Sequence, residues 1–564
     1  MNIVDEISSL LDEKSKVIGR TFHGTSYMAI QNIIRCIDTT LPFYNHSEVL
    51  SAEEVVNFKK IIEYGWPYLL KPYYFDIDIE KHLPFAIMTD ELVKWSLSNL
   101  VYCGKIAFCR QLLSLEKAKM ITLSKEDSSH FTFSYCTNES NDIEFLDRES
   151  FDFYTDKIAS QFVREKRQAK SFNEEKIKED FRKLITNPFG KLISYDTNPE
   201  IDDFYNEEGH YRLLMMQGYD DFAEDDLFGG IAYGKYVTIV ELIIGVAIKH
   251  SDACFMLKKD NPKVLLENLL TYTQSKQKAI SNYAEYMSWP ENEVEQIFEA
   301  ISLTKENFGY YLEYPCVAPP IFIEVGGEML MRSVAGCFAN PFSLLNKELK
   351  RKYKRDYDRA VNNRENRFRN ELFKIFPQEN VIKIPNEINI SFQNIRTDID
   401  AVVFDEKTGT LGLFQLKWQD RYDYSMKERY SRITNMFPKA NEWICKIKNW
   451  ISLNDSKSIL NALQIGSKLK SKIEIKEIYL FVISRNQMNF TGVELDKTVA
   501  WSSWYQLIES YARVKTHFDD PITELFLKIK TMNPAKIAEL DHNKSDQSDF
   551  IIDFGDFKIT NKLK

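Results

Sequence analysis

The sequence lacks the cysteine spacing of a disulfide framework or a zinc ribbon. Its eight cysteines are spread along the chain, and no two of them form a C-x-x-C pair. Cys103 and Cys109 are the closest two, with no histidine between them. Disulfide-rich secreted proteins and zinc ribbons are therefore excluded.

Long apolar runs are also missing. The longest, 237–248, contains Glu241 and is too short to span a bilayer, so it predicts a buried helix. The first residues, MNIVDEISSLLDEKSK, are acidic and amphipathic and lack the basic and apolar regions of a secretion signal. Together these absences predict a cytoplasmic protein without a membrane partner.

Common signatures of nucleotide and hydrolase sites do not occur. The chain has no P-loop, no G-x-G-x-x-G, no G-x-S-x-G and no internal repeat. The stretch 196–226 carries eleven acidic residues opposed only by Arg212, but it lacks EF-hand spacing and is interpreted as a solvated loop. Residues 1–314 show mainly helical periodicity, for example at 52–64, 90–117 and 263–302. We interpret them as an acidic sensor or regulatory region that binds a regulator or a partner protein.

The charge is divided unevenly along the 564 residues, a length that implies about three to five structural units. The whole chain has a net charge of -10, but residues 1–340 carry 35 Lys+Arg and 53 Asp+Glu, while 341–564 carry 38 and 30. An acidic protein as a whole argues against nucleic acid, whereas a basic C-terminal part attracts phosphate backbones. Chance drift in surface composition is the alternative explanation.

Breaker residues predict the domain boundaries. PCVAPP and the following IFIEVGGEMLMRS indicate a junction hairpin within 315–341. From Asn340-Pro341 a helical pattern continues to about Phe376, and its KELKRKYKRDYDRA stretch is strongly basic. That face is either a solvated helix surface or a contact with a phosphate backbone. We predict one domain over 342–520 and a polar C-terminal tail over 521–564.

The chemistry concentrates in two predicted strands, 397–404 and 411–418, joined by a short turn that contains Gly409. A symmetric turn places Asp400 opposite Gln415, and Asp398 opposite Lys417. Because side chains alternate along a strand, a carboxylate, an amide oxygen and an ammonium converge at one place. Such oxygen ligands suit Mg²⁺, and a lysine there orients the attacking water and stabilises charge on phosphorus.

The pattern Asp400, fourteen intervening residues and Gln415-Leu416-Lys417 resembles the core of the PD-(D/E)xK nuclease superfamily. The glutamine in place of the acid is similar to Mrr-type restriction endonucleases. This resemblance implies a restriction-endonuclease-like α-β-β-β-α-β core, so that the chain combines a mainly helical N-terminal region with a C-terminal α/β domain. The proline of the superfamily's name is absent, because Thr397 precedes Asp398.

The resemblance also implies roles for individual residues. Glu365 matches the glutamate of the helix before the first strand, and on a helical wheel it shares the inward face with Phe368, Leu372 and Phe376. Glu371 lies on the flank and is the weaker candidate. The expected metal ligands are Glu365, Asp400 and Gln415, with Mg²⁺ as cofactor and Mn²⁺ as a substitute. Lys417 is the expected catalytic lysine, and the residues expected to bind nucleic acid are Arg421, Lys427, Arg429 and Arg432.

The function implied is a Mg²⁺-dependent endonuclease that hydrolyses phosphodiester bonds in DNA, in restriction or anti-phage defence. A homodimer would supply the two sites needed for a duplex cut. Two alternatives stay open at this point. One is a non-catalytic module that binds nucleic acid or protein on a degenerate nuclease fold, favoured by the neutral Gln415. The other is a nuclease directed at RNA, because nothing in the sequence recognises a base or a 2′-hydroxyl.

Overall fold

The computed structural model describes residues 2–18, 22–45, 50–78, 87–135, 143–169, 172–314, 316–420, 426–469, 473–514, 519–532 and 550–562. It is a mixed α/β protein with 57% helix and 16% strand, arranged in several small mixed sheets, and its N-terminal part is mainly helical. None of the helices in these ranges is long and apolar enough to cross a bilayer.

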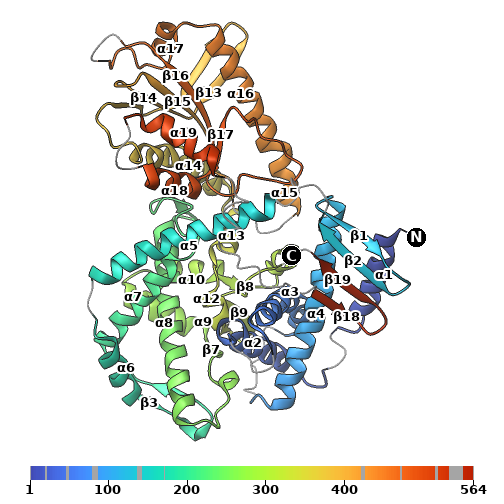
Figure 1. Cartoon of the computed structure of the whole chain (residues 1–564). Helices are drawn as coiled ribbons and strands as arrows, with labels where there is room; N and C mark the ends of the chain where they lie inside the picture. The colour runs from blue at the N-terminus through green and yellow to red at the C-terminus, as the bar shows by residue number, and fades with distance from the viewer. Residues whose placement is uncertain are drawn as a thin grey trace. The chain divides into compact units, whose positions relative to one another are not determined.

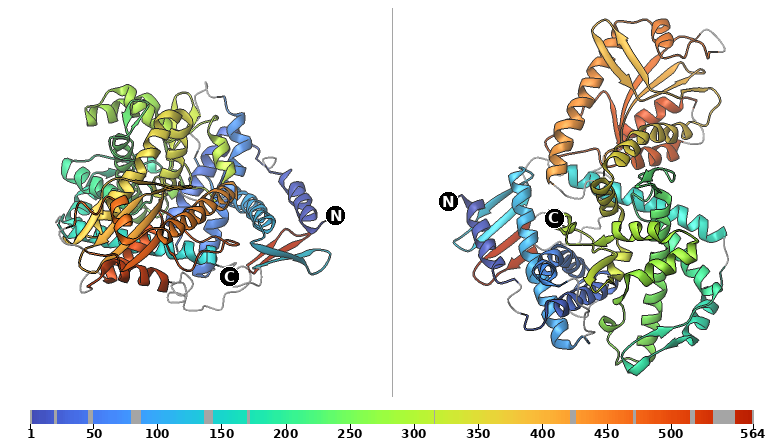
Figure 2. Two further views of the ribbon diagram at one scale, coloured as in Figure 1. Left: turned by 90° about the horizontal axis from the view of Figure 1, so that it is seen from above. Right: turned by 180° about the vertical axis from the view of Figure 1, so that it is seen from behind.

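The chain folds into two compact units that do not follow the predicted boundaries. The first unit comprises Met1–Phe133, Ala159–Asp358 and Ile551–Asn561, and the second comprises Ser134–Ile158, Arg359–Phe550 and Lys562–Lys564. The main division thus falls near 358 rather than at 342, and residues 521–564 are not a tail. The strands of 550–562 lie beside those of 121–135 (Figure 2), and β19 pairs with β2.

The first unit is built mainly from helices. They are α1 (Ile3–Ser15), α2 (Ser26–Phe43), α3 (Ala52–Asp76), α4 (Asp90–Lys117), α6 (Glu174–Lys183), α7 (Pro199–Leu214), α8 (Tyr233–Asp260), α9 (Lys276–Met287), α10 (Glu291–Ala300), α11 (Phe308–Glu313), α12 (Val334–Phe338) and α13 (Phe342–Lys352). The helix α5 (Ile143–Ala169) is shared, since its residues 143–158 belong to the second unit. The buried helix predicted over 237–248 is confirmed within α8.

Two four-stranded sheets complete the first unit. One has the order β1 (Ile121–Lys125), β2 (His130–Tyr135), β19 (Lys558–Lys562) and β18 (Phe550–Asp553). The other has the order β7 (Tyr272–Ser275), β10 (Met329–Arg332), β9 (Phe322–Gly326) and β8 (Ser302–Leu303). The short pairs are β3 (Ile185–Thr186) with β4 (Ser194–Tyr195), and β5 (Leu227–Phe228) with β6 (Ile231–Ala232). The hairpin predicted within 315–341 therefore exists, but it lies inside a sheet of the first unit and is not a junction.

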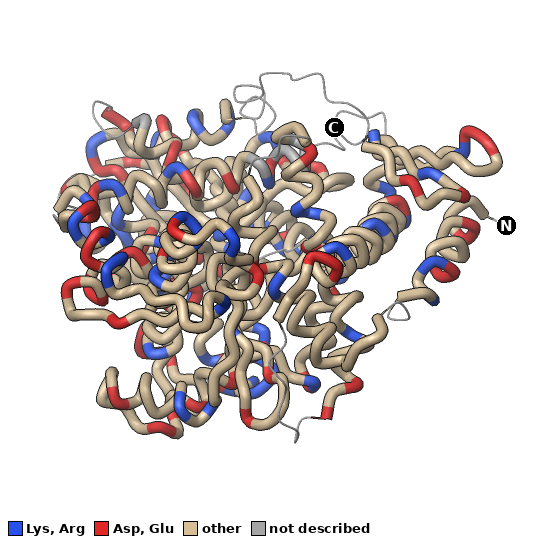
Figure 3. The backbone as a smooth tube through the Cα atoms, turned by 90° about the horizontal axis from the view of Figure 1, so that it is seen from below, with Lys and Arg blue, Asp and Glu red and all other residues tan. Residues whose placement is uncertain are grey.

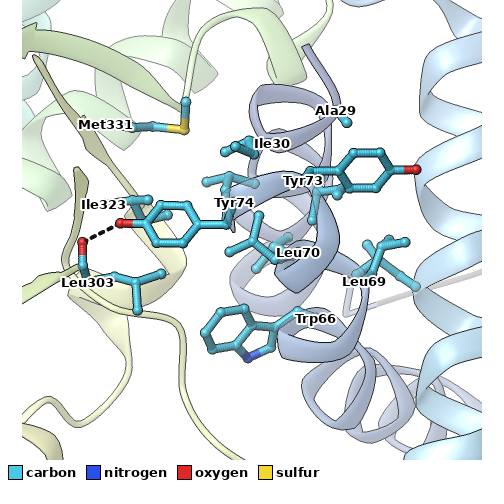
Figure 4. Close-up of a cluster of buried hydrophobic side chains, with 14 of the residues drawn as sticks. Ala29, Ile30, Trp66, Leu69, Leu70, Tyr73, Tyr74, Leu303, Ile323 and Met331 are labelled. Atoms are coloured by element: carbon cyan, nitrogen blue, oxygen red, sulfur yellow. Dashed lines mark hydrogen bonds between the residues drawn. The ribbon is translucent and has the colours of Figure 1, made fainter. Parts of the chain in front are cut away.

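Aromatic and aliphatic side chains from distant segments form the core of the first unit. Figure 4 shows Trp66 and Tyr74 of α3 among residues from α2 and the β9–β10 sheet. The Tyr74 hydroxyl donates to the Leu303 carbonyl at 2.9 Å, and the Trp66 indole N–H donates to the Val317 carbonyl at 2.8 Å. Each large ring thus buries its apolar body and still satisfies its polar atom.

The second unit is a five-stranded mixed sheet between two layers of helices (Figure 1). The strand order is β11 (Val381–Ile384), β14 (Ala401–Asp405), β15 (Thr410–Lys417), β16 (Glu477–Ser484) and β17 (Ala500–Ser503). The first two pairings are antiparallel, and the last two are parallel. One face packs on α14 (Lys354–Lys374), α18 (Trp504–Val514) and α19 (Pro521–Thr531), and the other on α16 (Phe437–Ser452) and α17 (Ser456–Ala462).

The two helix layers explain why the central strand β15 is apolar. β15 is buried on both faces, as its LGLFQL sequence predicts, because helices cover each side of the sheet.

A separate ribbon of β12 (Ile388–Phe392) and β13 (Ile395–Ile399) is inserted between β11 and β14. The short helix α15 (Met426–Ser431) follows β15.

The predictions for 196–226 and for 341–376 are wrong. The helical window predicted over 263–302 is interrupted by the strand β7 before α9 begins. The stretch 196–226 contains the helix α7 rather than a continuous solvated loop, since Asn198 caps it and Pro199 stands at its first turn. The single helix predicted from 341 to 376 is broken at Tyr353, whose backbone lies outside the helical region, so α13 and α14 are separate.

Lys and Arg are interspersed with Asp and Glu along the backbone (Figure 3).

Candidate functional site

Asp400 lies at the point where the β12–β13 ribbon ends and β14 begins. Its backbone N–H donates to the Phe414 carbonyl at 3.1 Å, although the paired residues of β14 begin at Ala401, opposite Phe414. The regular β14–β15 register therefore ends at Ala401. The bend is held from the helix side, because the Arg369 guanidinium donates to the Asp400 carbonyl oxygen. The predicted proximity of Asp400 and Gln415 is confirmed, because the Gln415 side-chain amide donates to Asp400 Oδ2.

The predicted pairing of Asp398 with Lys417 is wrong. Asp398 belongs to β13 and lies opposite Asn389 of β12, because the predicted strand 397–404 is broken at Asp400. The Trp443 indole N–H donates to the Asp398 carbonyl oxygen at 2.6 Å and fixes this strand against α16. Asp398 nevertheless stays close to Asp400, because the two flank a single bend.

Three carboxyl groups meet at this bend. Glu387, Asp398 and Asp400 each place an oxygen within 4.8 Å of the other two. Glu387 comes from the turn between β11 and β12, Asp398 from β13, and Asp400 from the entry to β14. Three hard oxygen donors at this spacing are a donor set that fits Mg²⁺ or Mn²⁺.

Asp400 is the most deeply buried of the three acidic residues. Its side chain is only 3% exposed, and burial raises the pKa of its carboxyl group to about 7, while the Lys417 ammonium and the Leu416 N–H act in the opposite direction. The Leu416 N–H donates to Asp400 Oδ2 at 2.6 Å, and the Gln415 side-chain amide donates to the same oxygen. A buried carboxyl group with a pKa near neutrality, next to a lysine, is typical of functional sites.

Glu365 lies on α14 and faces the same cluster. Partial desolvation raises the pKa of its carboxyl group, Lys417 lowers it, and the negative charges of Glu387 and Asp398 raise it further. The helical wheel placed Glu365 on the inward face, but its side chain is exposed, while Phe368, Leu372 and Phe376 are buried. It therefore borders the cluster from the solvent side.

The remaining predicted ligand, Gln415, points its amide nitrogen at Asp400. In this arrangement it donates a hydrogen bond instead of offering an oxygen to a cation. Glu371, the weaker candidate on α14, pairs with Arg485 at 2.5 Å and is engaged in packing of the fold. The Arg485 guanidinium in turn lies 4.6 Å from the centroid of the Trp418 ring.

Two arginines predicted to bind nucleic acid are instead part of the interior. Arg429 is buried and makes a bidentate ion pair with Glu144 of α5, with N–O distances of 2.8–3.0 Å. Arg432 is buried too and donates to the Asp420 carbonyl oxygen. This corrects the prediction for both, because neither guanidinium faces solvent. Lys427 is exposed, and Arg421 lies outside the described residues.

Glu387 is the residue that sequence reasoning missed. It stands in the turn of VIKIPNEINI, between two short strands, and has no spacing relation to Asp400 that a pattern would reveal. Only the insertion of the β12–β13 ribbon brings it to the bend. The membership of Asp398 in this cluster could have been predicted, because Asp398 is only two residues from Asp400 in the sequence.

Comparisons with known proteins add no assignment: no family model, no curated protein and no solved structure matches this chain.

Proposed function

We propose that the protein is a metal-dependent nuclease that hydrolyses phosphodiester bonds in DNA, with its site at the bend before β14. The observation that carries the proposal is the convergence of Glu387, Asp398 and Asp400 next to Lys417 on the neighbouring strand. Carboxylates gathered this closely repel each other, and a divalent cation offsets that repulsion.

Each residue of the site has a proposed role that follows from its chemistry. The carboxylates of Glu387, Asp398 and Asp400 hold Mg²⁺, or Mn²⁺ in its place, and Glu365 borders the cluster on its exposed side. When bound, the cation neutralises charge on the phosphate and lowers the pKa of a water ligand. Lys417 orients the attacking water and stabilises the negative charge that develops on the phosphoryl oxygens.

The connectivity of the second unit supports the same proposal. The order α14, β11, β14, β15, α16 and β16 follows the α-β-β-β-α-β core of the PD-(D/E)xK superfamily that the sequence resembles. The β12–β13 ribbon is then an insertion that supplies two of the three carboxylates from its entry and its exit. A defence role in restriction of foreign DNA rests on the resemblance to Mrr-type enzymes alone.

The test is a cleavage assay on plasmid, linear duplex, single-stranded DNA and RNA, with Mg²⁺, with Mn²⁺ and with EDTA. We expect metal-dependent cutting of DNA that falls about 100-fold or more in Lys417→Ala and in Asp400→Asn. The matched control is Lys407→Ala, which removes the same charge from the turn at the other end of β15, where Lys407 pairs with Asp519 in solvent. Cleavage that persists unchanged in Lys417→Ala would contradict the proposal.

A second candidate function has one observation in its favour. The Gln415 amide and the Leu416 N–H together satisfy Asp400 Oδ2 without a cation, as expected of a non-catalytic module that keeps the fold and binds nucleic acid or protein. Metal-independent DNA binding, with no cutting of any of the four substrates, would favour this function. Cutting of RNA alone would instead assign the site to RNA.

A further inference from the structure

A large hollow in the first unit is separate from the acidic cluster. Its volume is about 960 Å³, near the upper end of the range for small-molecule sites. Every residue that lines it belongs to the first unit. Its apolar lining comes from Leu41, Pro42, Phe43, Val163, Met215, Ile248, Pro319 and Phe338.

Two helices present one side each to this hollow. From α5 the lining residues are Ser160, Val163, Arg164, Arg167 and Gln168. From α7 they are Glu208, Tyr211 and Arg212, followed by Met215 at the C-cap of that helix. Both sets follow the spacing of three and four residues that defines one face of a helix. Because side chains that share a face turn the same way, the polar groups of α5 and α7 converge on one space.

Positive charge predominates on these two faces. Arg167 is neutralised by Glu208 at 2.6 Å and lies over the Tyr211 ring, with 5.0 Å to its centroid. Arg212 donates to the Phe338 carbonyl oxygen at 2.7 Å. Neither Arg212 nor Arg164 has a carboxylate partner among the described residues.

The fifth charged residue of the lining, Glu63, does not alter this balance. Glu63 accepts a hydrogen bond from the Cys316 thiol at 3.1 Å, and burial raises the pKa of its carboxyl group. The hollow therefore has three guanidinium groups against two carboxylates, in a chain whose first 340 residues are strongly acidic.

We propose that this hollow binds a nucleotide, with its phosphates on Arg164 and Arg212 and its ring system against the apolar wall. Guanidinium groups match phosphate oxygens in geometry and charge. The volume exceeds what an inorganic anion needs, and the aliphatic side chains of Leu41, Val163 and Ile248 offer apolar contact area. The site is independent of the proposed nuclease function.

The test is equilibrium binding of ATP, AMP, GTP and inorganic phosphate to the full chain in EDTA, which keeps the acidic cluster free of cations. We expect one nucleotide to bind per chain, more tightly than inorganic phosphate, and about tenfold more weakly in Arg164→Ala and in Arg212→Gln. The Arg164 side chain is exposed, so we expect Arg164→Ala to remain folded even if Arg212→Gln does not.

The control is Lys166→Ala on the same helix, whose ammonium lies over the Phe162 ring and does not line the hollow. Its affinity should equal that of the wild type. Absence of binding by every nucleotide overturns the proposal, and so does binding that is unchanged in Arg164→Ala. Inorganic phosphate or a short-chain phospholipid that binds as tightly as ATP overturns the choice of a nucleotide.

Discussion

Asp400 combines burial, a lysine neighbour and two hydrogen-bond donors in one carboxyl group. Its pKa of about 7 lies well above the value of about 3.9 expected for an aspartate in an unfolded chain. The raised pKa means that the folded protein holds a proton on this group through the range from pH 4 to pH 7. At the proposed metal site, cation binding and proton binding would therefore compete for the same oxygens.

This competition predicts the pH dependence of metal binding. Since a cation binds the ionised carboxylate, the Mg²⁺ affinity should be constant above about pH 8 and should fall about tenfold for each pH unit below 7. Calorimetric titration of the metal-free protein between pH 5.5 and 8.5 measures this directly. An affinity independent of pH over that range would place the cation elsewhere.

Gln415 gives a second prediction at the scale of one residue. Gln415→Glu replaces a donor to Asp400 with a second buried acid, so the metal-free protein should lose about 1–3 kcal/mol of unfolding free energy. With Mg²⁺ the sign reverses, because an anionic ligand replaces a neutral one, and we expect at least about tenfold tighter binding. Thermal unfolding with and without Mg²⁺ separates the two effects.

The comparison variant for this experiment is Gln415→Met. It has a similar size but offers neither a donor nor a ligand, so it should destabilise the metal-free protein without any gain in Mg²⁺ affinity. A gain in Gln415→Met equal to that of Gln415→Glu would show that the charge of the ligand is irrelevant.

At the scale of elements, two buried acidic residues bind the N-terminal half of α5 to the rest of the second unit. Glu144 pairs with Arg429 and accepts the Thr491 N–H at 2.8 Å. Asp147 accepts the N–H groups of Met488 and Asn489, at 3.0 and 2.8 Å. A segment far away in sequence thus closes the loop that follows β16.

Loss of this ion pair should be costly. Glu144→Ala leaves the Arg429 guanidinium buried without its carboxylate, and we expect a loss of about 3–5 kcal/mol in the unfolding of the second unit. The double variant Glu144→Ala with Arg429→Met should recover most of it, because no unpaired charge remains. Glu165→Ala, at an exposed position on the same helix, is the control. Equal stabilities of Glu144→Ala and the control, measured by chemical denaturation, would contradict this role.

For the whole molecule, the division into units decides which fragments fold. The predicted domain 342–520 omits α19, whose Ile522, Leu525 and Ile529 are buried against the sheet. Burying each of these side chains contributes about 1.5–3 kcal/mol, so their sum is comparable to the total stability of a typical domain. The fragment also omits Glu144 and Asp147.

We therefore expect fragment 342–520 to be unfolded when it is produced alone. Fragment 359–550 regains α19 but still lacks α5, so co-expression with residues 134–158 should raise its yield of folded protein. Circular dichroism and the dispersion of amide NMR signals report the outcome. A cooperatively folded 342–520 would show that the predicted boundary was adequate.

Much of the fold was predictable where local pattern and burial agree. The helices over 52–64 and 90–117, the hairpin of β14 and β15 and the strand β16 follow from periodicity, because each buries the face that its sequence makes apolar. The break at Tyr353 and the bend at Asp400 were not, since neither residue type forces a change of direction. The burial of Arg429 and Arg432 was not predictable either. Arg429 pairs with Glu144, which lies far away along the chain, and Arg432 donates to the backbone carbonyl of Asp420.

The sequence by itself determined that Asp400 and Gln415 lie next to each other, because a hairpin with a short turn fixes its own register as far as Ala401 and Phe414. It also determined that β15 is a central strand, since only a strand covered on both faces is apolar throughout. Only the tertiary structure decided that Glu387 joins the acidic cluster, that α5 is shared between the two units and that 551–561 belongs to the first unit. Such contacts bring together residues with no fixed spacing in the sequence, so no local pattern encodes them.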